Sequence, residues 1–343
     1  MDVRVLLTGA GGFVGHHTLS HLLKTTDYYF IVTDSFKHRG NSARLRSVFE
    51  EVKSAEDRVK VVTHDLTTPI DLVTSREIGD VQVIISMASE SHVDRSIEEP
   101  RNFIENNTNL ILTLLDFSRQ LDNLELFLQI STDEVYGPAP GGILHKEWDP
   151  YFPSNPYSAS KAAQESICYA YWRTFGVPMI LTNTMNIVGE RQDTEKFIPM
   201  VISNLIKNKP IPVHAKKVGD KWKSGSRYYL HARNQADALR YLIFNKHKLN
   251  LNYVEDSSIL EKFHVVGEKE VSNAEMVNLL AKFIETTPKI DFTDFHSSRP
   301  GHDLRYALDG EKLKKFGWVP PVPLEESLQK TVNWYLNNKN WIP

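Results

Sequence analysis

Short runs of apolar and β-branched residues alternate along the first half of the chain with longer segments whose apolar positions have a helical spacing. The runs that predict strands are Val3 to Thr8, Tyr29 to Thr33, Val59 to Thr63, Val81 to Ser86 and Leu124 to Ile130. The segments that predict helices are Phe13 to Leu23, Arg101 to Leu121 and Asn155 to Phe175. Alternating strands and helices are typical of an α/β fold with a doubly wound parallel sheet, and we expect that architecture.

The second half of the chain has fewer elements of this kind. Strands are predicted at Met179 to Thr184 and Phe263 to Val266, and helices at Asn273 to Ile284 and Leu324 to Leu336. We expect residues 1–184 to form the domain with the parallel sheet. Residues 185–343 should form mainly a smaller C-terminal α/β lobe, with the chain crossing back to the first domain. The proline-containing stretch within residues 131–161 predicts an active-site loop rather than a tether.

Composition and charge change this picture little. The 343 residues are 41% hydrophobic and 24% charged with a formal net charge of −3, which indicates neither nucleic acid nor membrane as a partner. The single cysteine, Cys168, cannot form an intrachain disulfide, and its apolar surroundings predict a packed core thiol in a reducing compartment. Met1 is followed at once by a strand rather than by a signal sequence, and no stretch is long enough for a membrane span. We therefore expect a cytoplasmic protein.

A glycine-rich turn joins the first predicted strand to the first predicted helix. Gly9 permits the tight turn, Gly12 lets the backbone approach a pyrophosphate, and Gly15 allows the helix to pack closely on the strand. The helix start, with Phe13 and Val14, then faces the phosphates. Strand, turn and helix in this order predict a Rossmann-type dinucleotide site.

Acidic residues follow the next strands. Asp34 ends the second strand, near the distance expected for an acid that binds the adenosine ribose, and a carboxylate there favours NAD over NADP because it repels a 2′-phosphate. A helix cap is the alternative role for Asp34. Arg39 and Arg44 lie downstream and could instead serve a phosphate. The other residues assigned to the cofactor site follow the third and fourth strands: Asp65, Leu66 and Ala88.

Two adjacent carboxylates, Asp133 and Glu134, emerge after Thr132 from the end of the fifth strand, just ahead of Tyr157 and Lys161. Four residues apart on a helix, Tyr157 and Lys161 share one face, so the ammonium can lower the pKa of the phenol. An acid and a base side by side require environments that separate their pKa values. A solvated loop pair is the alternative for the carboxylates, but their place at a sheet edge ahead of Tyr157 favours catalysis.

These residues resemble the extended short-chain dehydrogenase/reductase family, and within it the dTDP-glucose 4,6-dehydratases. The segments that carry the resemblance are Thr8 to Gly15, Glu90 to Ser96, Thr132 to Gly137, Asn155 to Lys161 and Arg299 to Tyr306. No metal is expected.

The resemblance implies a mechanism. Tyr157, assisted by Lys161 and Thr132, removes the proton of the sugar 4-hydroxyl while a hydride passes to NAD. Glu134 then removes the C5 proton, and Asp133 donates a proton to the departing 6-hydroxyl. The hydride returns to C6, so NAD is regenerated and stays bound. The resemblance also implies that Asn107 braces the active-site backbone.

The resemblance further implies a nucleoside-diphosphate sugar as the substrate and a homodimer paired through the helices Arg101 to Leu121 and Asn155 to Phe175. The residues assigned to the substrate are Ser91, His92, Asn186, Lys196, Phe197, Arg227 and Arg299. Capping or packing is an alternative role for Glu90 and His92. Residues 214–234 depart from the family pattern: residues 214–226 are longer and more basic than the family's turn, and Tyr228 and Asn234 stand where aspartates are typical. Trp222, an aromatic among lysines, could stack a base or cover phosphates, or it could belong to a solvated hairpin. The nucleotide base therefore stays open.

Two other activities remain as alternatives. A nucleoside-diphosphate-sugar 4-epimerase or a uronic acid decarboxylase would use the same oxidation at C4, but a 4-epimerase needs no acid pair. An alternative of another class is a non-catalytic sensor of NAD or a nucleotide sugar on the same fold. The presence of Tyr157, Lys161 and the acid pair favours an enzyme.

Overall fold

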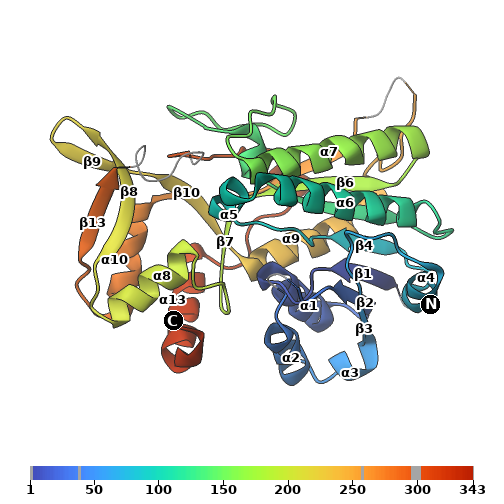
Figure 1. Cartoon of the computed structure of the whole chain (residues 1–343), viewed down its shortest axis with the longest axis horizontal. Helices are drawn as coiled ribbons and strands as arrows, with labels where there is room; N and C mark the ends of the chain where they lie inside the picture. The colour runs from blue at the N-terminus through green and yellow to red at the C-terminus, as the bar shows by residue number, and fades with distance from the viewer. Residues whose placement is uncertain (1–2, 38–39, 256–258, 295–302, 343) are drawn as a thin grey trace.

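A seven-stranded parallel sheet forms the centre of the larger body of the molecule (Figure 1). The computed structural model describes all residues except 1–2, 38–39, 256–258, 295–302 and 343. The strands, in spatial order, are β11 (Glu261–Val265), β6 (Met179–Thr184), β5 (Leu126–Thr132), β4 (Val83–Ser86), β1 (Arg4–Thr8), β2 (Tyr29–Asp34) and β3 (Val59–Thr63). All six neighbouring pairs are parallel. The strand order reverses between β1 and β4, where ligands bind in doubly wound sheets, and the predicted Rossmann-type fold is confirmed.

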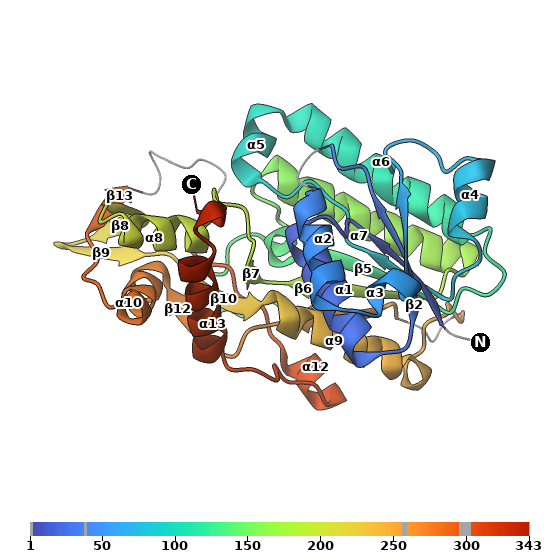
Figure 2. The same cartoon turned by 90° about the horizontal axis from the view of Figure 1, so that it is seen from below.

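Helices cover both faces of this sheet (Figure 2). One face carries α1 (Phe13–Thr25), α2 (Ser42–Glu51), α3 (Ala55–Arg58), α9 (Ala232–Phe244) and α12 (Glu311–Phe316). The other face carries α4 (Leu72–Ile78), α5 (Val93–Glu98), α6 (Pro100–Ser118) and α7 (Pro156–Phe175). Alternate side chains of β1 enter the two cores, Val5 and Leu7 on one side and Leu6 on the other. Each is fully buried, which is worth about 1.5–3 kcal/mol per side chain. Cys168 is a buried free thiol of the second core, as predicted.

The start of α7 is fixed by its sequence. The Asn155 side chain accepts a hydrogen bond from the Ser158 amide at 2.8 Å, and the Ser158 hydroxyl accepts one from the Asn155 amide at 3.2 Å. Pro156 occupies the first helical position, where a missing N–H costs nothing. The helix ends at Gly176, whose φ of 68° lies in the left-handed region. These two ends set the register that presents Tyr157 and Lys161 to the sheet edge.

Small sheets and helices make up the C-terminal lobe in its described residues (Figures 1 and 2). One sheet consists of β12 (Glu270–Ser272), β10 (Ser226–His231) and β7 (Asn186–Val188), and the other of β13 (Ile290–Asp294), β8 (Ile211–Val218) and β9 (Lys221–Ser224). The helices are α8 (Phe197–Ile206), α10 (Asn273–Ile284) and α13 (Leu324–Asn337). Their apolar faces share a core of their own, which includes Val201, Leu280 and Leu328. Short 3₁₀ helices occur at η1 (Asp133–Tyr136), η2 (Lys246–Lys248) and η3 (Lys339–Trp341).

Along its described residues the chain crosses back from the lobe to the large sheet twice, first for α9 and β11 and later for α12. Helix α9 packs against α1, and β11 joins β6 as an edge strand of the seven-stranded sheet. Most predicted strands and helices are found within one or two residues of their expected ends. Residues 214–234, the segment whose sequence departs from the family pattern, form most of the β8–β9 hairpin and β10, with Gly219 at the turn (φ 60°).

Candidate active site

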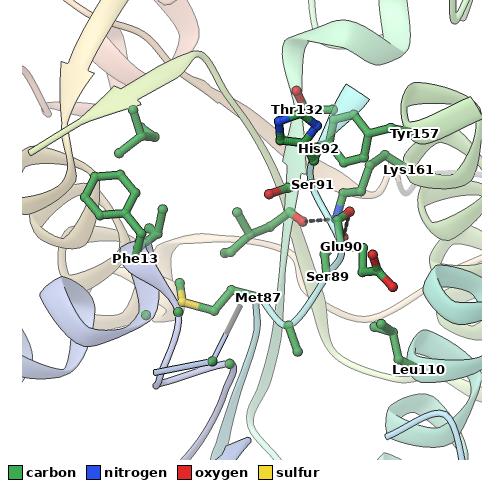
Figure 3. Close-up of a pocket in the computed structure, with 18 of the residues that line it drawn as sticks. Phe13, Met87, Ser89, Glu90, Ser91, His92, Leu110, Thr132, Tyr157 and Lys161 are labelled. Atoms are coloured by element: carbon green, nitrogen blue, oxygen red, sulfur yellow. Dashed lines mark hydrogen bonds between the residues drawn. The ribbon is translucent and has the colours of Figure 1, made fainter. Parts of the chain in front are cut away.

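A long pocket opens at the carboxyl ends of β1, β4, β5 and β6, between the large sheet and the C-terminal lobe. Figure 3 shows Phe13 on one side of this pocket and Tyr157 and Lys161 on the other, with Thr132 beside Tyr157. Every residue assigned from the sequence to the cofactor or to catalysis lines it: Gly9, Gly12, Phe13, Val14, Gly15, Asp34, Asp65, Leu66, Ala88, Thr132, Asp133, Glu134, Tyr157 and Lys161. The topology therefore brings the predicted groups together, although their roles remain predictions.

The glycine turn leaves the start of α1 open to the pocket. Gly9 has a φ of 72°, and a Cβ there would lie 2.9 Å from the Ala88 Cα. A Cβ on Gly15 would collide with the Gly9 carbonyl, so the close packing of α1 on the turn requires glycine. Gly12 is the N-cap of α1 and no side chain caps this helix. The amides of its first turn are thus directed to the pocket, where a helix start attracts phosphate.

The acidic groups at the adenosine end are held in place by backbone amides. Asp34 accepts hydrogen bonds from the Gly11 amide at 2.9 Å and the Phe36 amide at 2.8 Å. Each carboxylate oxygen can accept a second bond, so a ribose hydroxyl fits the remaining positions. The pKa of Asp65 is lowered to about 2, chiefly by a hydrogen bond from Lys37 at 2.7 Å.

Arg44 does not serve a phosphate in this structure. Its guanidinium is buried and pairs with Asp193 at 2.9 Å, and its Nε donates to the Arg191 carbonyl at 3.0 Å. This arginine therefore joins α2 to the C-terminal lobe, and the NAD preference expected from Asp34 gains support. Arg39, the other candidate, lies outside the described residues.

Tyr157 and Lys161 lie on one face of α7, but the ammonium bonds to other groups. The Lys161 Nζ donates to the Ile130 carbonyl at 2.8 Å and to the Gln164 side chain at 2.6 Å. Burial lowers the pKa of Lys161 to about 8, against the charge of Glu165, which raises it. Burial and the nearby Glu134 charge raise the pKa of Tyr157 above its ordinary value. The protein alone therefore does not produce the lowered phenol pKa that the spacing predicts.

Asp133 is a buried carboxyl that retains its proton near neutral pH. Burial and the charge of Glu134 raise the pKa of Asp133 from 3.8 to about 7. Its Oδ1 accepts a hydrogen bond from the Thr132 hydroxyl at 3.0 Å, whereas its buried Oδ2 has no hydrogen-bond partner among the described residues. A carboxyl that still carries its proton in about half of the molecules at pH 7 and lines a pocket can act as a proton donor.

Glu134 has a different environment from its neighbour. Its Oε2 accepts hydrogen bonds from the Asn155 amide group at 3.1 Å and from the Tyr306 hydroxyl at 3.4 Å. Burial raises the pKa of Glu134, while the Asn155 hydrogen bond and the charges of Arg227 and Lys196 oppose that rise. The two carboxyls thus have unequal partners, which is the condition for one to work as an acid and the other as a base.

Asn107 braces the backbone beside the pocket, as the resemblance implies. Its fully buried amide accepts from the Glu90 amide at 2.9 Å and donates to the Glu90 carbonyl at 3.1 Å. The same amide bonds the hydroxyls of Ser89, at 3.1 Å, and Ser160, at 2.8 Å. These contacts link the loop after β4 to α7, so the position of Glu90 in the pocket wall depends on this asparagine.

The expected substrate residues divide into three groups. Ser91, His92, Asn186 and Lys196 line the pocket. His92 also caps α5, where its Nδ1 accepts from the Arg95 amide at 3.3 Å, so the alternative capping role is present. Phe197 packs beside the lobe core and is not among the described residues that line the pocket. Arg299 lies outside the described residues.

Arg227, which was expected to bind a phosphate, donates to backbone carbonyls instead. Its guanidinium donates to the carbonyls of Ser226, Asp303 and Leu304 at 2.6–2.7 Å and stacks over the Tyr306 ring at 4.7 Å. The described pocket lining does not include it. Arg227 thereby secures the segment that carries Tyr306, whose hydroxyl reaches Glu134.

The basic segment around Trp222 forms a hairpin. The Trp222 ring, on β9, stacks on the Phe292 ring, on β13, at a centroid distance of 6.1 Å with 11° between the planes. The two rings lie across β8, the middle strand of this sheet. Of the two replaced acidic positions, Asn234 is buried and donates to the Val322 carbonyl at 2.8 Å. The structure therefore favours the hairpin over the base-stacking alternative.

Sequence reasoning missed several groups that hold the pocket-lining residues in place. The Thr8 hydroxyl accepts hydrogen bonds from the Met87 and Ala88 amides at 3.1 Å, which fixes the loop after β4. Tyr306 and Asn155, which stand in the sequence only as ends of motifs, are direct partners of Glu134. A hydroxyl at a strand end is a sequence signal for the Thr8 contacts. Nothing in the local sequence connects Tyr306 to Glu134, which lies far away in the chain.

These features fit NAD: a helix start without a side-chain cap, glycines that admit a pyrophosphate, and Asp34 at the ribose end. Among the residues that the structure describes, no group of three or more histidines, cysteines or acids could hold a metal ion. In the same part of the chain, no helix is long and apolar enough to cross a membrane.

Known proteins resemble this chain over nearly its whole length. The family described as GDP-mannose 4,6 dehydratase matches residues 6–331. A dTDP-glucose 4,6-dehydratase of Neisseria meningitidis serogroup B is 33% identical, with 98% of this chain and 94% of that protein covered.

Solved structures extend the comparison. A dTDP-glucose 4,6-dehydratase of Streptomyces venezuelae with NAD bound has a TM-score of 0.84 at 31% identity, covering 99% of this chain and 98% of that one. A UDP-glucose 4-epimerase of Thermus thermophilus in complex with NAD has a TM-score of 0.81 at 25% identity, covering 97% and 99%.

Proposed function

The chain belongs to the GDP-mannose 4,6 dehydratase family, and on that premise we propose that it removes water from a nucleoside-diphosphate hexose, with NAD bound, to give the 4-keto-6-deoxy sugar. One observation carries this proposal: the buried Asp133 carboxyl, with a pKa near 7 and an unpartnered Oδ2 among the described residues, lies beside Glu134 in the pocket of Tyr157. Elimination of water needs such an acid next to a base. Because the relatives named above are dTDP-glucose 4,6-dehydratases, we take a dTDP-glucose-like sugar as the substrate.

The first step is oxidation at C4. Tyr157 takes the proton of the 4-hydroxyl, and the Thr132 hydroxyl holds the same oxygen. When bound, NAD would take the C4 hydride, return it to C6 and add a positive ring that favours the ionised Tyr157. Lys161, held between the Ile130 carbonyl and Gln164, supplies a second positive charge to this end of the pocket.

The second step is loss of water across C5 and C6. The C4 ketone acidifies the C5 proton, which Glu134 removes, and Asp133 gives its proton to the 6-hydroxyl as the C6–O bond breaks. The product is a 4-keto-5,6-ene and water. As C6 is reduced, Glu134 returns its proton to C5. The amide of Asn155 and the hydroxyl of Tyr306 hold the Glu134 carboxylate for both transfers.

The phosphates and the base lie toward the C-terminal lobe in this proposal. Lys196 lines the pocket at the start of α8, and its ammonium also bonds the Ser91 carbonyl at 3.3 Å. A cation at a helix start suits a diphosphate. Asn186 adds an amide to the same wall.

The deciding experiment incubates the purified protein with the dTDP-, UDP-, GDP- and CDP-linked forms of glucose and of glucuronic acid and measures product mass. Loss of one water without net NADH supports dehydration. An unchanged mass with altered stereochemistry would indicate the epimerase alternative, and loss of carbon dioxide from a uronic acid the decarboxylase. Turnover of no sugar would favour the sensor.

We also propose a homodimer that works in the cytoplasm. Ile104 and Leu112 are both more than a third exposed on α6, and their spacing puts them on one stripe of that helix. The free buried thiol of Cys168 suits a reducing compartment. Light scattering should give twice the chain mass, and Leu112→Glu should shift it toward the monomer. Cell fractionation tests the location.

A further inference from the structure

Lys262 is a fully buried lysine at the edge of the large sheet, outside the pocket. It belongs to β11, and its ammonium lies 2.8 Å from the Glu165 carboxylate, whose side chain is also fully buried. The hydroxyl of Tyr151 is 2.9 Å from the same nitrogen. The rings of Tyr136 and Tyr151 lie 4.7 Å from it and that of Trp148 5.1 Å, so aromatic faces cover the rest of the charge.

Glu165 connects this cation to the helix that carries the reactive phenol. It follows Lys161 by one turn on α7, and the Tyr151 hydroxyl donates to its Oε2 at 2.5 Å. Its Oε1 accepts from the Asn183 amide at 2.7 Å. Asn183 also donates to the Thr132 carbonyl at 2.9 Å. An unbroken series of buried contacts therefore runs from Lys262 to the backbone just before the acid pair.

A second series reaches the other end of the same turn. Tyr136 ends η1, the 3₁₀ turn that contains Asp133 and Glu134, and its ring packs on the Lys262 ammonium. The Tyr136 hydroxyl donates to the Glu147 carbonyl at 2.8 Å and lies 2.8 Å from His264. The ion pair thus contacts one end of the catalytic turn through the Tyr136 ring and reaches the other end through Asn183, without lining the pocket.

Stability alone gives little reason for such a pair. Removing two charges from water is costly, and buried ion pairs are often replaced by apolar residues without loss of stability. What an ion pair adds is direction, because each hydrogen bond fixes its partner at a definite distance and angle. Here the partners belong to β6, β11, α7 and the active-site loop, which must meet for the reaction.

We propose that Lys262 and Glu165 are positioning residues that hold the Thr132–Asp133–Glu134 turn against Tyr157 for the loss of water. The inference rests on the proposed dehydration and names the residues that set its geometry. The Glu165 charge also raises the pKa of Lys161 against the effect of burial, so the pair influences the oxidation step as well.

The test compares Lys262→Met, Glu165→Gln and the double variant with the wild-type enzyme, using dTDP-glucose. Lys262→Met leaves Glu165 buried without its cation, and we expect kcat to fall by about 100-fold, the effect of a misplacement of about 1 Å. KM should change less than about twofold, because the pocket lining is untouched. The double variant carries no uncompensated charge and should recover at least about tenfold in kcat over Lys262→Met.

A second Lys–Glu pair, which joins helix α12 to the same strand, provides the control. Lys312 and Glu261 are 3.0 Å apart and partly exposed. Lys312→Met and Glu261→Gln should keep the wild-type kcat. Unchanged kcat in folded Lys262→Met, or a loss that only follows the folded fraction in the single and double variants alike, overturns the proposal.

A crystal structure of Lys262→Met separates this inference from the proposed function. We expect the Thr132–Glu134 turn to move from Tyr157 by at least about 0.5 Å, the tolerance of catalytic geometry. An unmoved turn overturns the positioning role whatever the reaction. Absence of water loss in the wild-type enzyme, with the turn displaced in the variant, would instead overturn the dehydration. If Lys262→Met does not fold, the double variant supplies both the kcat and the structure.

Discussion

The protonation of Asp133 leads to the sharpest prediction. Burial and the Glu134 charge raise the pKa of Asp133 to about 7. At pH 6 about nine in ten of these carboxyls carry the proton, and at pH 8 about one in ten. Only the protonated form can donate to the departing hydroxyl, so the rate of water loss should fall about tenfold per pH unit above about 7.

The perturbation is Asp133→Asn, which keeps the size of the side chain and removes the acidic proton. Water loss should slow by about 100- to 10,000-fold, the usual contribution of a general acid. Oxidation at C4 should persist, because Tyr157 and Lys161 are unchanged. Stopped-flow absorbance of NADH in a single turnover separates the two steps, since its rise reports oxidation and its decay follows water loss. The exposed Asp122→Asn is the matched control and should leave both phases unchanged.

The same pKa makes a prediction about stability. In the unfolded chain Asp133 titrates near 3.8, so between about pH 4 and 7 the folded protein binds more protons than the unfolded one. The favourable contribution is complete below about pH 4 and is lost as the pH rises through about 7. Relative to wild type, Asp133→Asn should therefore gain stability between pH 5 and pH 8, by about 3 kcal/mol. A decay phase in Asp133→Asn with the wild-type rate and pH dependence, and no relative gain in melting temperature, would refute the reasoning.

Four further substitutions test the roles assigned to individual residues. Tyr157→Phe should abolish both NADH formation and water loss, whereas Glu134→Gln should still form NADH transiently and block water loss; equal reduction signals in the two variants would contradict the assignment. Asn107→Ala removes the buried side chain that accepts from the partly buried Glu90 amide, at a cost of up to about 1–3 kcal/mol, and should lower both the melting temperature and kcat, which thermal denaturation and steady-state rates measure. Asp34→Asn removes the charge at the ribose end and should weaken NAD binding while admitting NADP; calorimetry that finds the same preference in both proteins would count against Asp34 as the selector.

Much of the fold follows from local patterns in the sequence. The strands β1 to β6 are apolar runs bounded by turns, and a parallel sheet with both faces covered requires such runs. Their alternation with helices determines a doubly wound order, because crossovers are right-handed and ligands collect at the carboxyl edge. The glycine turn and the acid pair can therefore be assigned to that edge from the residue pattern alone.

The contacts that depend on distant parts of the chain were not predictable in this way. Arg227 and Arg44 are of the residue type that binds phosphates. In the structure Arg227 instead donates to backbone carbonyls, and Arg44 pairs with a carboxylate, both of which folding brings from another part of the chain. The sequence specifies that an arginine is present, but the partner is decided by tertiary packing. Lys262 is the clearest case, since its partners Tyr151 and Glu165 are supplied by other elements and an isolated lysine in a strand suggests an exposed edge.

The position of the buried Lys262 explains why two buried carboxyls, Glu165 and Asp133, differ in charge: the first is a fixed anion and the second a proton donor. Glu165 has Lys262 at 2.8 Å and hydrogen-bond donors on both oxygens, so it can act as a fixed anion that orients its neighbours. Asp133 is as deeply buried, but the described residues provide its Oδ2 with no donor, and burial raises its pKa toward neutrality. A cation beside Asp133 would lower that pKa and remove the acid that water loss requires. Under the proposed mechanism, the reaction depends on holding the Lys262 charge on the far side of Asn183, where it can position the turn without ionising Asp133.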